Sequence, residues 1–110
     1  MIAYDDFLRV DVRAGTVLAA EPLAGARKPA YVLRIDFGPE LGERRSSAQI
    51  TGRYSAGELV GTQVCAVVNF PPKRIAGIQS DVLVLGMDDA AGNVILVRPT
   101  FPVPNGRRLY

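Results

Sequence analysis

Apolar and polar residues alternate along the first half of the chain with the two-residue period of β-strands. The segment Tyr31–Phe37 (YVLRIDF) is the clearest case, because every second residue is apolar and falls on one side. The segment Val10–Ala20 is also compatible with a strand, and Gly15 within it indicates a bulge or a sharp bend. Glu43–Thr51 has the weaker pattern of a polar third strand, and Glu21–Pro29 (EPLAGARKP) predicts a loop by its proline and glycine content.

One short helix is predicted after these three strands. Ser55 and Glu58 have the spacing of a capping box, and Gly61 is placed to end the helix. Gln63–Phe70 (QVCAVVNF) then forms a largely apolar run, which is typical of a central strand buried on both faces. The two prolines that follow, Pro71–Pro72, end this strand because proline cannot donate to a strand ladder.

Two further strands are predicted at Asp81–Gly86 and Asn93–Arg98, followed by an irregular proline-rich tail. Asp5–Asp6 could cap a helical turn near the start of the chain. The order of three strands, one helix and then more strands predicts an all-β OB-fold, a five-stranded Greek-key barrel with a short helix between strands 3 and 4. A β-sandwich is the alternative, but it would not explain a single helix in the middle of the chain.

Composition narrows the classes of function. The 110 residues predict a single domain, 1–110, and they include no histidine, no tryptophan and one cysteine, Cys65. Without histidine there is no Ser-His-Asp triad and no zinc site of the usual kinds. The sequence also has no glycine-rich phosphate loop, no paired cysteines and no pair of carboxylates in an apolar setting, so we expect no catalytic residue, no metal, no cofactor and no enzyme activity. Cys65 lies in the most apolar strand, where we expect a structural thiol. No leader or membrane-spanning stretch is visible, so we expect a cytoplasmic protein without membrane insertion.

The net charge is only +2, but the basic residues form doublets near the predicted strand ends: Arg27–Lys28, Arg44–Arg45, Lys73–Arg74 and Arg107–Arg108. Cations at loops could follow a phosphate backbone, or they could be ordinary solvated surface. The most unusual segment is 69–80 (NFPPKRIAGIQS). It could be a structured crossover loop or a presented loop stiffened by its prolines, with Ile75 and Ile78 either exposed or plugging the barrel end.

Several motifs in this chain resemble the tRNA-binding-domain family of the EMAP-II and methionyl-tRNA synthetase C-terminal type, and in particular its small protein-export chaperones. The motifs are DVRAGTV (11–17), ARKPAY (26–31), IDFG (35–38), SSAQIT (46–51), NFPPKRIAG (69–77), SDVLVLG (80–86) and PVPNG (102–106). The resemblance covers nearly the whole chain, and SSAQIT and NFPPKRIAG are specific to the chaperone branch.

The resemblance implies an OB-fold with short N- and C-terminal extensions that assembles as a homodimer. It also implies a chaperone, or holdase, that binds unfolded export precursors and cooperates with the preprotein translocation machinery. The alternative that it carries is a tRNA-binding module. Against the tRNA-binding pattern of the wider family, Ala76 falls where relatives usually carry arginine, and Pro71 replaces a frequent lysine.

Three sets of site residues follow as expectations. The polypeptide-binding set consists of Phe70, Lys73, Arg74, Ile75 and Ile78. The tRNA-binding set of the alternative consists of Asn69, Lys73, Arg74, Gly77, Ser80, Arg44 and Arg45. The dimer interface is expected within 1–9 and 100–110, where a lone small barrel would have trouble covering the apolar residues Phe101, Val103, Leu109 and Tyr110.

Overall fold

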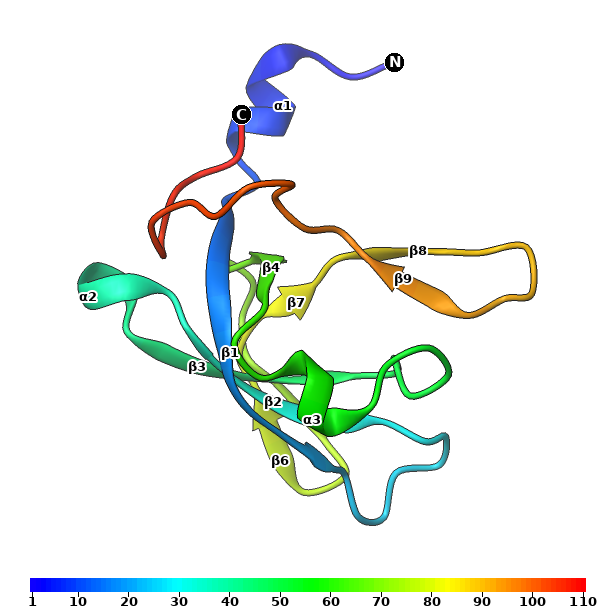
Figure 1. The fold of residues 1–110 in the computed structure, drawn as a ribbon. Coiled ribbons are helices and arrows are strands. Elements are labelled where there is room, and N and C mark those ends of the chain that lie inside the picture. Colours follow the sequence, from blue (N-terminus) through cyan, green and yellow to red (C-terminus); the bar gives the residue numbers. More distant parts are fainter.

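A strongly bent, antiparallel five-stranded sheet forms the body of the molecule in the computed structural model, which describes residues 1–110 (Figure 1). Its strand order is β3-β2-β1-β4-β7, where the strands are β1 (Val12–Pro22), β2 (Tyr31–Asp36), β3 (Glu43–Ala48), β4 (Gln63–Val67) and β7 (Leu83–Val84). The open edge at β3 is bridged to the segment before β7, since the amide of Asp81 donates to the carbonyl of Arg45 at 2.8 Å. The sheet is therefore nearly closed into a barrel, as the all-β OB-fold prediction requires.

The remaining elements are short. The helices are α1 (Tyr4–Leu8), α2 (Gly38–Leu41) and α3 (Ala56–Leu59), and two hairpins consist of β5 (Lys73–Ile75) with β6 (Ile78–Ser80) and β8 (Gly86–Asp88) with β9 (Val94–Leu96). The predicted mid-chain helix is α3, and its capping box is formed: the Ser55 amide donates to Glu58 Oε1 at 2.7 Å and the Glu58 amide donates to Ser55 Oγ at 3.3 Å. None of the three helices has the length and hydropathy that a membrane span requires.

The core lies inside the barrel and takes its largest side chains from β2 and from Phe37, the residue directly after it. Leu33, Ile35 and Phe37 are fully buried, together with Val64 of β4 and Leu59 of α3. All of β4 after its first residue is buried, as predicted for a central strand. The strand ends at Val67, however, and Asn69 and Phe70, which were predicted to continue it, are exposed. Burial in an apolar strand raises the pKa of the Cys65 thiol, as expected for a structural cysteine.

Gly15 does not form the predicted bulge. The register of β1 against β2 shifts between Val17 and Ala19 instead. A Cβ atom at Gly15 would lie 2.7 Å from Ile35 Cγ2 and 2.8 Å from the Phe37 ring, so glycine is needed there because the core packs directly on the backbone.

The segment 69–80, expected as a loop, contains the β5–β6 hairpin. Its turn is Ala76–Gly77, with φ of +48° and +86°, and two positive φ values in a two-residue loop match the twist of a tight hairpin. Alanine is an unusual residue in this conformation, so the usual turn signal is missing from the sequence. The prediction of one strand at 81–86 was also too simple, since β7 ends at Val84 and β8 begins at Gly86.

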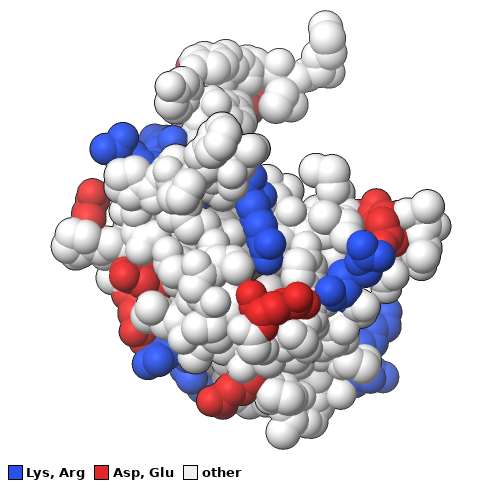
Figure 2. All heavy atoms as spheres, viewed as in Figure 1, with Lys and Arg blue, Asp and Glu red and all other residues white.

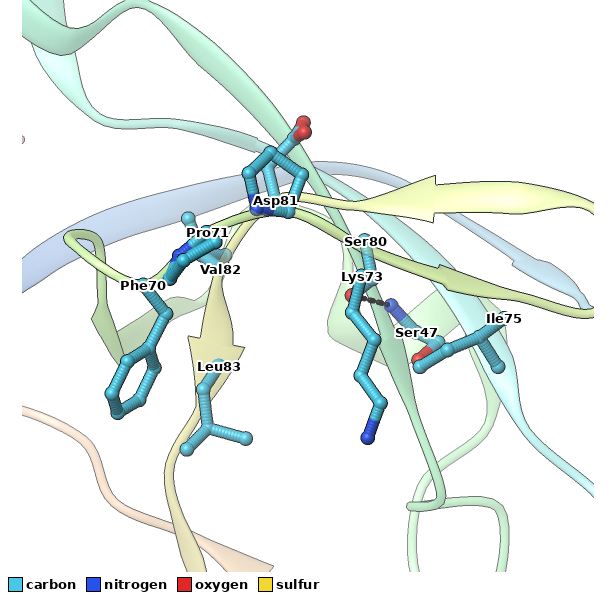
Figure 3. A pocket seen from close by; sticks show the side chains of 10 residues that line it. Ser47, Phe70, Pro71, Lys73, Ile75, Ser80, Asp81, Val82 and Leu83 are labelled. Atoms are coloured by element: carbon cyan, nitrogen blue, oxygen red, sulfur yellow. Dashed lines mark hydrogen bonds between the residues drawn. The ribbon is translucent and has the colours of Figure 1, made fainter.

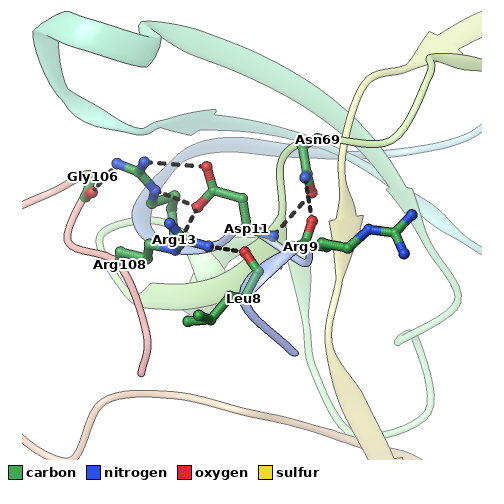
Figure 4. A network of polar contacts seen from close by, with 7 residues as sticks. All are labelled: Leu8, Arg9, Asp11, Arg13, Asn69, Gly106 and Arg108. Atoms are coloured by element: carbon green, nitrogen blue, oxygen red, sulfur yellow. Dashed lines mark hydrogen bonds and ion pairs between the residues drawn. The ribbon is translucent and has the colours of Figure 1, made fainter. Parts of the chain in front are cut away.

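The two ends of the chain meet at one end of the barrel, and a polar network holds them there (Figure 4). Asp11 pairs with Arg13 at 2.6 Å and with Arg108 at 3.5 Å, and Arg108 Nη2 donates to the carbonyl of Leu8 at 2.6 Å. Asn69, just after β4, receives a hydrogen bond from the Asp11 amide at 3.0 Å and donates to the carbonyl of Arg9 at 2.8 Å. The start of β1, the end of β4 and the C-terminal tail are thus fixed relative to one another.

Candidate functional site: an apolar groove beside the β5–β6 hairpin

A cavity of about 530 Å³ opens between the β5–β6 hairpin, β7 and the end of β4. We refer to it as the hairpin groove. It is lined by Ser47, Phe70, Pro71, Pro72, Lys73, Ile75, Ser80, Asp81, Val82 and Leu83. The pairing of β7 with β4 builds this site. It sets Leu83 opposite Val67, and Phe70 follows Val67 by only three residues, so Leu83 and Phe70 come close together.

Two large apolar side chains dominate the groove. Phe70 is 52% exposed and Leu83 is 50% exposed, and both extend to the same side of the backbone (Figure 3). The adjacent Pro71 and Pro72 lock their own φ angles, so the wall that carries Phe70 is stiff. The groove therefore offers water-exposed apolar surface in a conformation that needs little ordering on binding.

The charged groups of the groove are not balanced. The Lys73 side chain extends to the same side as Leu83, whereas the Asp81 carboxylate points away (Figure 3). Asp81 is satisfied within the chain, since Oδ1 accepts from Gln79 Nε2 at 2.8 Å and Oδ2 from the Arg45 amide at 3.1 Å. The four ion pairs of the structure involve Arg13, Arg34, Arg53 and Arg108, so Lys73 has no carboxylate partner.

Burial of Asp81 opposes its ionisation, but other contacts prevail. The hydrogen bonds from Gln79 and from the Arg45 amide, with the charges of Arg44 and Arg45, lower the pKa of the Asp81 carboxyl below its ordinary value. Asp81 is therefore ionised at neutral pH and tied to β3, and it does not neutralise Lys73.

A second cavity, of about 660 Å³, adjoins the first and shares Ser47 and Ile75 with it. We refer to it as the basic pocket. Its wall is the loop between β1 and β2, including Arg27 and Lys28, neither of which takes part in an ion pair. We refer to these two adjacent cavities together as the trough, which has an apolar end at Phe70 and Leu83 and a cationic end at Arg27 and Lys28.

The polypeptide-binding residues predicted from the sequence are partly brought together. Phe70, Lys73 and Ile75 line the hairpin groove. Arg74 is exposed, and its Nη1 donates to the carbonyl of Gly77 at 3.0 Å, while Ile78 is half-buried and lines neither cavity. The assignment of these residues to polypeptide binding stays a prediction.

The tRNA-binding residues of the alternative are more dispersed. Both polar atoms of the Asn69 amide hold the chain at Arg9 and Asp11. Ser80 is buried, and its Oγ accepts from the Ser47 amide at 3.1 Å. Gly77 forms the hairpin turn, and Arg44 and Arg45 lie on β3, where Arg44 Nε donates to the carbonyl of Leu41 at 3.1 Å. This set also stays a prediction.

The predicted dimer residues lie at the end of the barrel where the termini meet. Phe101, Val103, Leu109 and Tyr110 are all exposed, and so are most apolar residues of the N-terminal arm, namely Met1, Ile2, Tyr4 and Leu8. Figure 2 shows this arm projecting from the body with almost no charged atoms on the visible face. The structure therefore places the two terminal segments beside each other, as an interface would require.

Sequence reasoning did not find Leu83 or the role of the Arg27–Lys28 loop as part of the trough. Leu83 lies within the predicted strand Asp81–Gly86, and nothing local in this apolar run shows that its side chain faces outward. The structure brings together no group of three His, Cys, Asp or Glu side chains that could hold a metal ion.

Residues 12–108 match the model of the family described as "Putative tRNA binding domain". Over the whole chain, the structure superposes on the chaperone CsaA from Bacillus anthracis with a TM-score of 0.93 and 54% identity, covering 99% of that protein. It superposes on CsaA from Picrophilus torridus with the same TM-score of 0.93 and 44% identity, covering 100% of that protein. The chain belongs to the tRNA-binding-domain family, on its CsaA branch.

Within this family, the chain is also similar to methionine–tRNA ligases. It is 38% identical to the enzyme from Porphyromonas gingivalis over 108 residues, but it spans only 15% of that enzyme's length. A protein related to methionyl-tRNA synthetase from Pyrococcus horikoshii has the same fold, with a TM-score of 0.88 and 28% identity. These relationships support a chaperone role or a tRNA-binding role for the CsaA-like chain.

Proposed function

We propose that this CsaA-like protein is a chaperone that holds unfolded export precursors and presents them to the preprotein translocation machinery in the cytoplasm. The observation that carries the proposal is the hairpin groove, where Phe70 and Leu83 are each about half exposed on a stiff wall. Exposed apolar side chains gathered in one hollow are typical of interaction sites, because such a surface gains free energy when another apolar surface covers it.

The groove suits an unfolded chain better than a folded partner. Its volume of about 530 Å³ admits a few side chains, and its polar lining is limited to Ser47, Ser80, Lys73 and Asp81. An unfolded polypeptide presents isolated apolar side chains on flexible backbone, which can enter such a hollow without a large complementary surface. Weak binding that exchanges readily is what a holding chaperone needs.

We further propose that the protein acts as a homodimer through the terminal segments. The apolar arm around α1 and the tail residues Phe101, Leu109 and Tyr110 leave a large apolar area exposed on one copy. A second copy has the same surface, so a two-fold contact would cover both.

The second candidate function is tRNA binding, and the family match and the cationic end of the trough favour it. A phosphate backbone would follow Arg27, Lys28 and Lys73, and its affinity would fall steeply with salt because counterions are released on binding. Apolar binding in the hairpin groove should instead persist at physiological salt.

The test is a competition titration. A labelled, permanently unfolded polypeptide and a labelled tRNA are each titrated with the protein at low and at physiological salt. The proposal expects polypeptide binding at both salt concentrations and loss of tRNA at the higher one. The reverse result would make the protein a tRNA-binding module.

A matched pair of variants locates the site. Leu83→Asp places a charge in the groove, and Leu18→Asp places the same charge on β1 at a residue of comparable exposure, 39%. We expect only Leu83→Asp to abolish polypeptide binding and the suppression of aggregation, with both variants folded by circular dichroism. Equal effects of the two variants would remove the groove from the proposal.

A further inference from the structure

We infer that the trough selects polypeptide segments in which a large apolar side chain is followed by acidic side chains. This inference rests on the proposed function and adds the chemistry of the client. The apolar side chain lies between Phe70 and Leu83, and the acidic side chains lie over Lys73 and towards Arg27 and Lys28. Lys73 is the specificity-determining residue at the junction.

The continuity of the two cavities carries the first step. The hairpin groove and the basic pocket share Ser47 and Ile75 in their linings, so the two cavities are adjacent and meet at these residues. The apolar end carries Phe70, Val82 and Leu83, and the far end carries Arg27 and Lys28. One extended segment would therefore meet apolar surface first and positive charge next.

The charge balance carries the second step. Lys73, Arg27 and Lys28 are absent from all four ion pairs. The one carboxylate that lines the trough, that of Asp81, accepts two hydrogen bonds from its own chain and points away from Lys73 (Figure 3). Uncompensated positive charge beside an apolar hollow attracts an anionic ligand and repels a cationic one.

The geometry of Lys73 carries the third step. The residue belongs to β5, whose pairing with β6 sets Lys73 opposite Ser80 and Ile75 opposite Ile78. The hairpin thereby fixes the origin of the lysine side chain next to Ser80, and the side chain lines the same groove as Leu83 (Figure 3). The ammonium group can then meet a carboxylate next to whichever side chain fills the apolar end.

The test uses three labelled peptides with the same apolar core, flanked on one side by glutamate, glutamine or lysine. Binding is measured by fluorescence anisotropy at physiological salt. Because a partly exposed ion pair contributes up to about 1 kcal/mol, we expect the glutamate peptide to bind roughly threefold to fivefold more tightly than the glutamine peptide. The lysine peptide should bind more weakly than both.

Charge reversal provides the decisive comparison. In Lys73→Glu the order of the three peptides should invert. Arg53→Glu changes the net charge equally at a residue that lines neither cavity and makes only a loose ion pair, at 3.9 Å, so it should keep the wild-type order. The same inversion in both variants would show a general charge effect and overturn the assignment of Lys73.

The remaining outcomes separate this inference from the proposed function. Equal binding of the three peptides, still abolished by Leu83→Asp, would overturn the acidic selectivity and leave the chaperone proposal standing. Failure of all three to bind would overturn both. Displacement of the glutamate peptide by stoichiometric tRNA at physiological salt would assign the cationic end to nucleic acid and overturn the inference.

Discussion

Truncation of the exposed phenyl ring in the groove, Phe70→Ala, should weaken polypeptide binding more than it weakens the fold. A phenylalanine side chain can bury about 150–250 Å². Since Phe70 is 52% exposed, roughly half of that area is free for a ligand to cover. At about 25 cal/mol per Å², complete coverage would contribute roughly 2–3 kcal/mol, which is a ceiling on the loss.

The expected loss is smaller than this ceiling. Alanine keeps a methyl group, and a ligand lying in the groove reaches one face of the ring. We therefore expect a loss of about 1 kcal/mol, which corresponds to a roughly fivefold increase in Kd. The ring is also half in contact with the protein, so a decrease of a few degrees in Tm should accompany the change.

The assay is fluorescence anisotropy with a labelled, permanently unfolded polypeptide, together with thermal unfolding of each variant. The control is Met87→Ala, which removes an apolar side chain that is 67% exposed and lines neither cavity of the trough. The Kd of the control should stay within a factor of two of the wild-type value. If Phe70→Ala also stays within that factor, the reasoning that places the client against this ring is refuted.

Three further predictions concern packing, pH and assembly. Gly15→Ala should lower the free energy of unfolding by roughly 1–3 kcal/mol, because the added methyl group would lie 2.8 Å from the Phe37 ring. An unchanged midpoint of unfolding in urea would contradict this packing. The lowered pKa of Asp81 stabilises the fold above the ordinary carboxyl pKa of about 4, and this contribution is lost as the pH falls through the folded-state pKa. Asp81→Asn should therefore lose less stability than the wild type between about pH 5 and 2, measured by acid titration followed by circular dichroism. Identical titration curves for the two proteins would contradict this prediction. Leu109→Asp should convert the dimer to a monomer in sedimentation velocity, whereas the control Leu18→Asp should remain dimeric, since Leu18 is 39% exposed and Leu109 is 40% exposed. If both variants remain dimeric, the interface lies elsewhere.

The sequence pattern predicted the barrel well where local signals are strong. The alternation in Tyr31–Phe37 identifies β2 and three of the largest core side chains, and the Ser55–Glu58 spacing identifies α3. Such signals depend on residues that are neighbours in sequence, so they survive without knowledge of the fold. The OB-fold was then predicted from the position of this helix between the third and the fourth predicted strand.

The site was harder to predict because it depends on distant pairings. Leu83 faces the groove only because it pairs with Val67 on β4, and no local pattern encodes that register. The β5–β6 hairpin was missed because its turn uses Ala76 at φ +48°, where the usual signal is asparagine or glycine. The basic doublet Arg27–Lys28 was visible, but its place beside Ile75 follows from the closure of the barrel.

The shared location of the two chain ends has a practical consequence for construction. Both termini leave from one end of the barrel, and the β5–β6 hairpin lies towards the other end (Figure 1). Methionine–tRNA ligases carry a similar domain within a chain about seven times as long, so the fold tolerates covalent attachment to a large neighbour. A fluorescent protein or an affinity handle joined at either end should therefore leave the trough open, although an attachment at either terminal segment would crowd a second copy docking there.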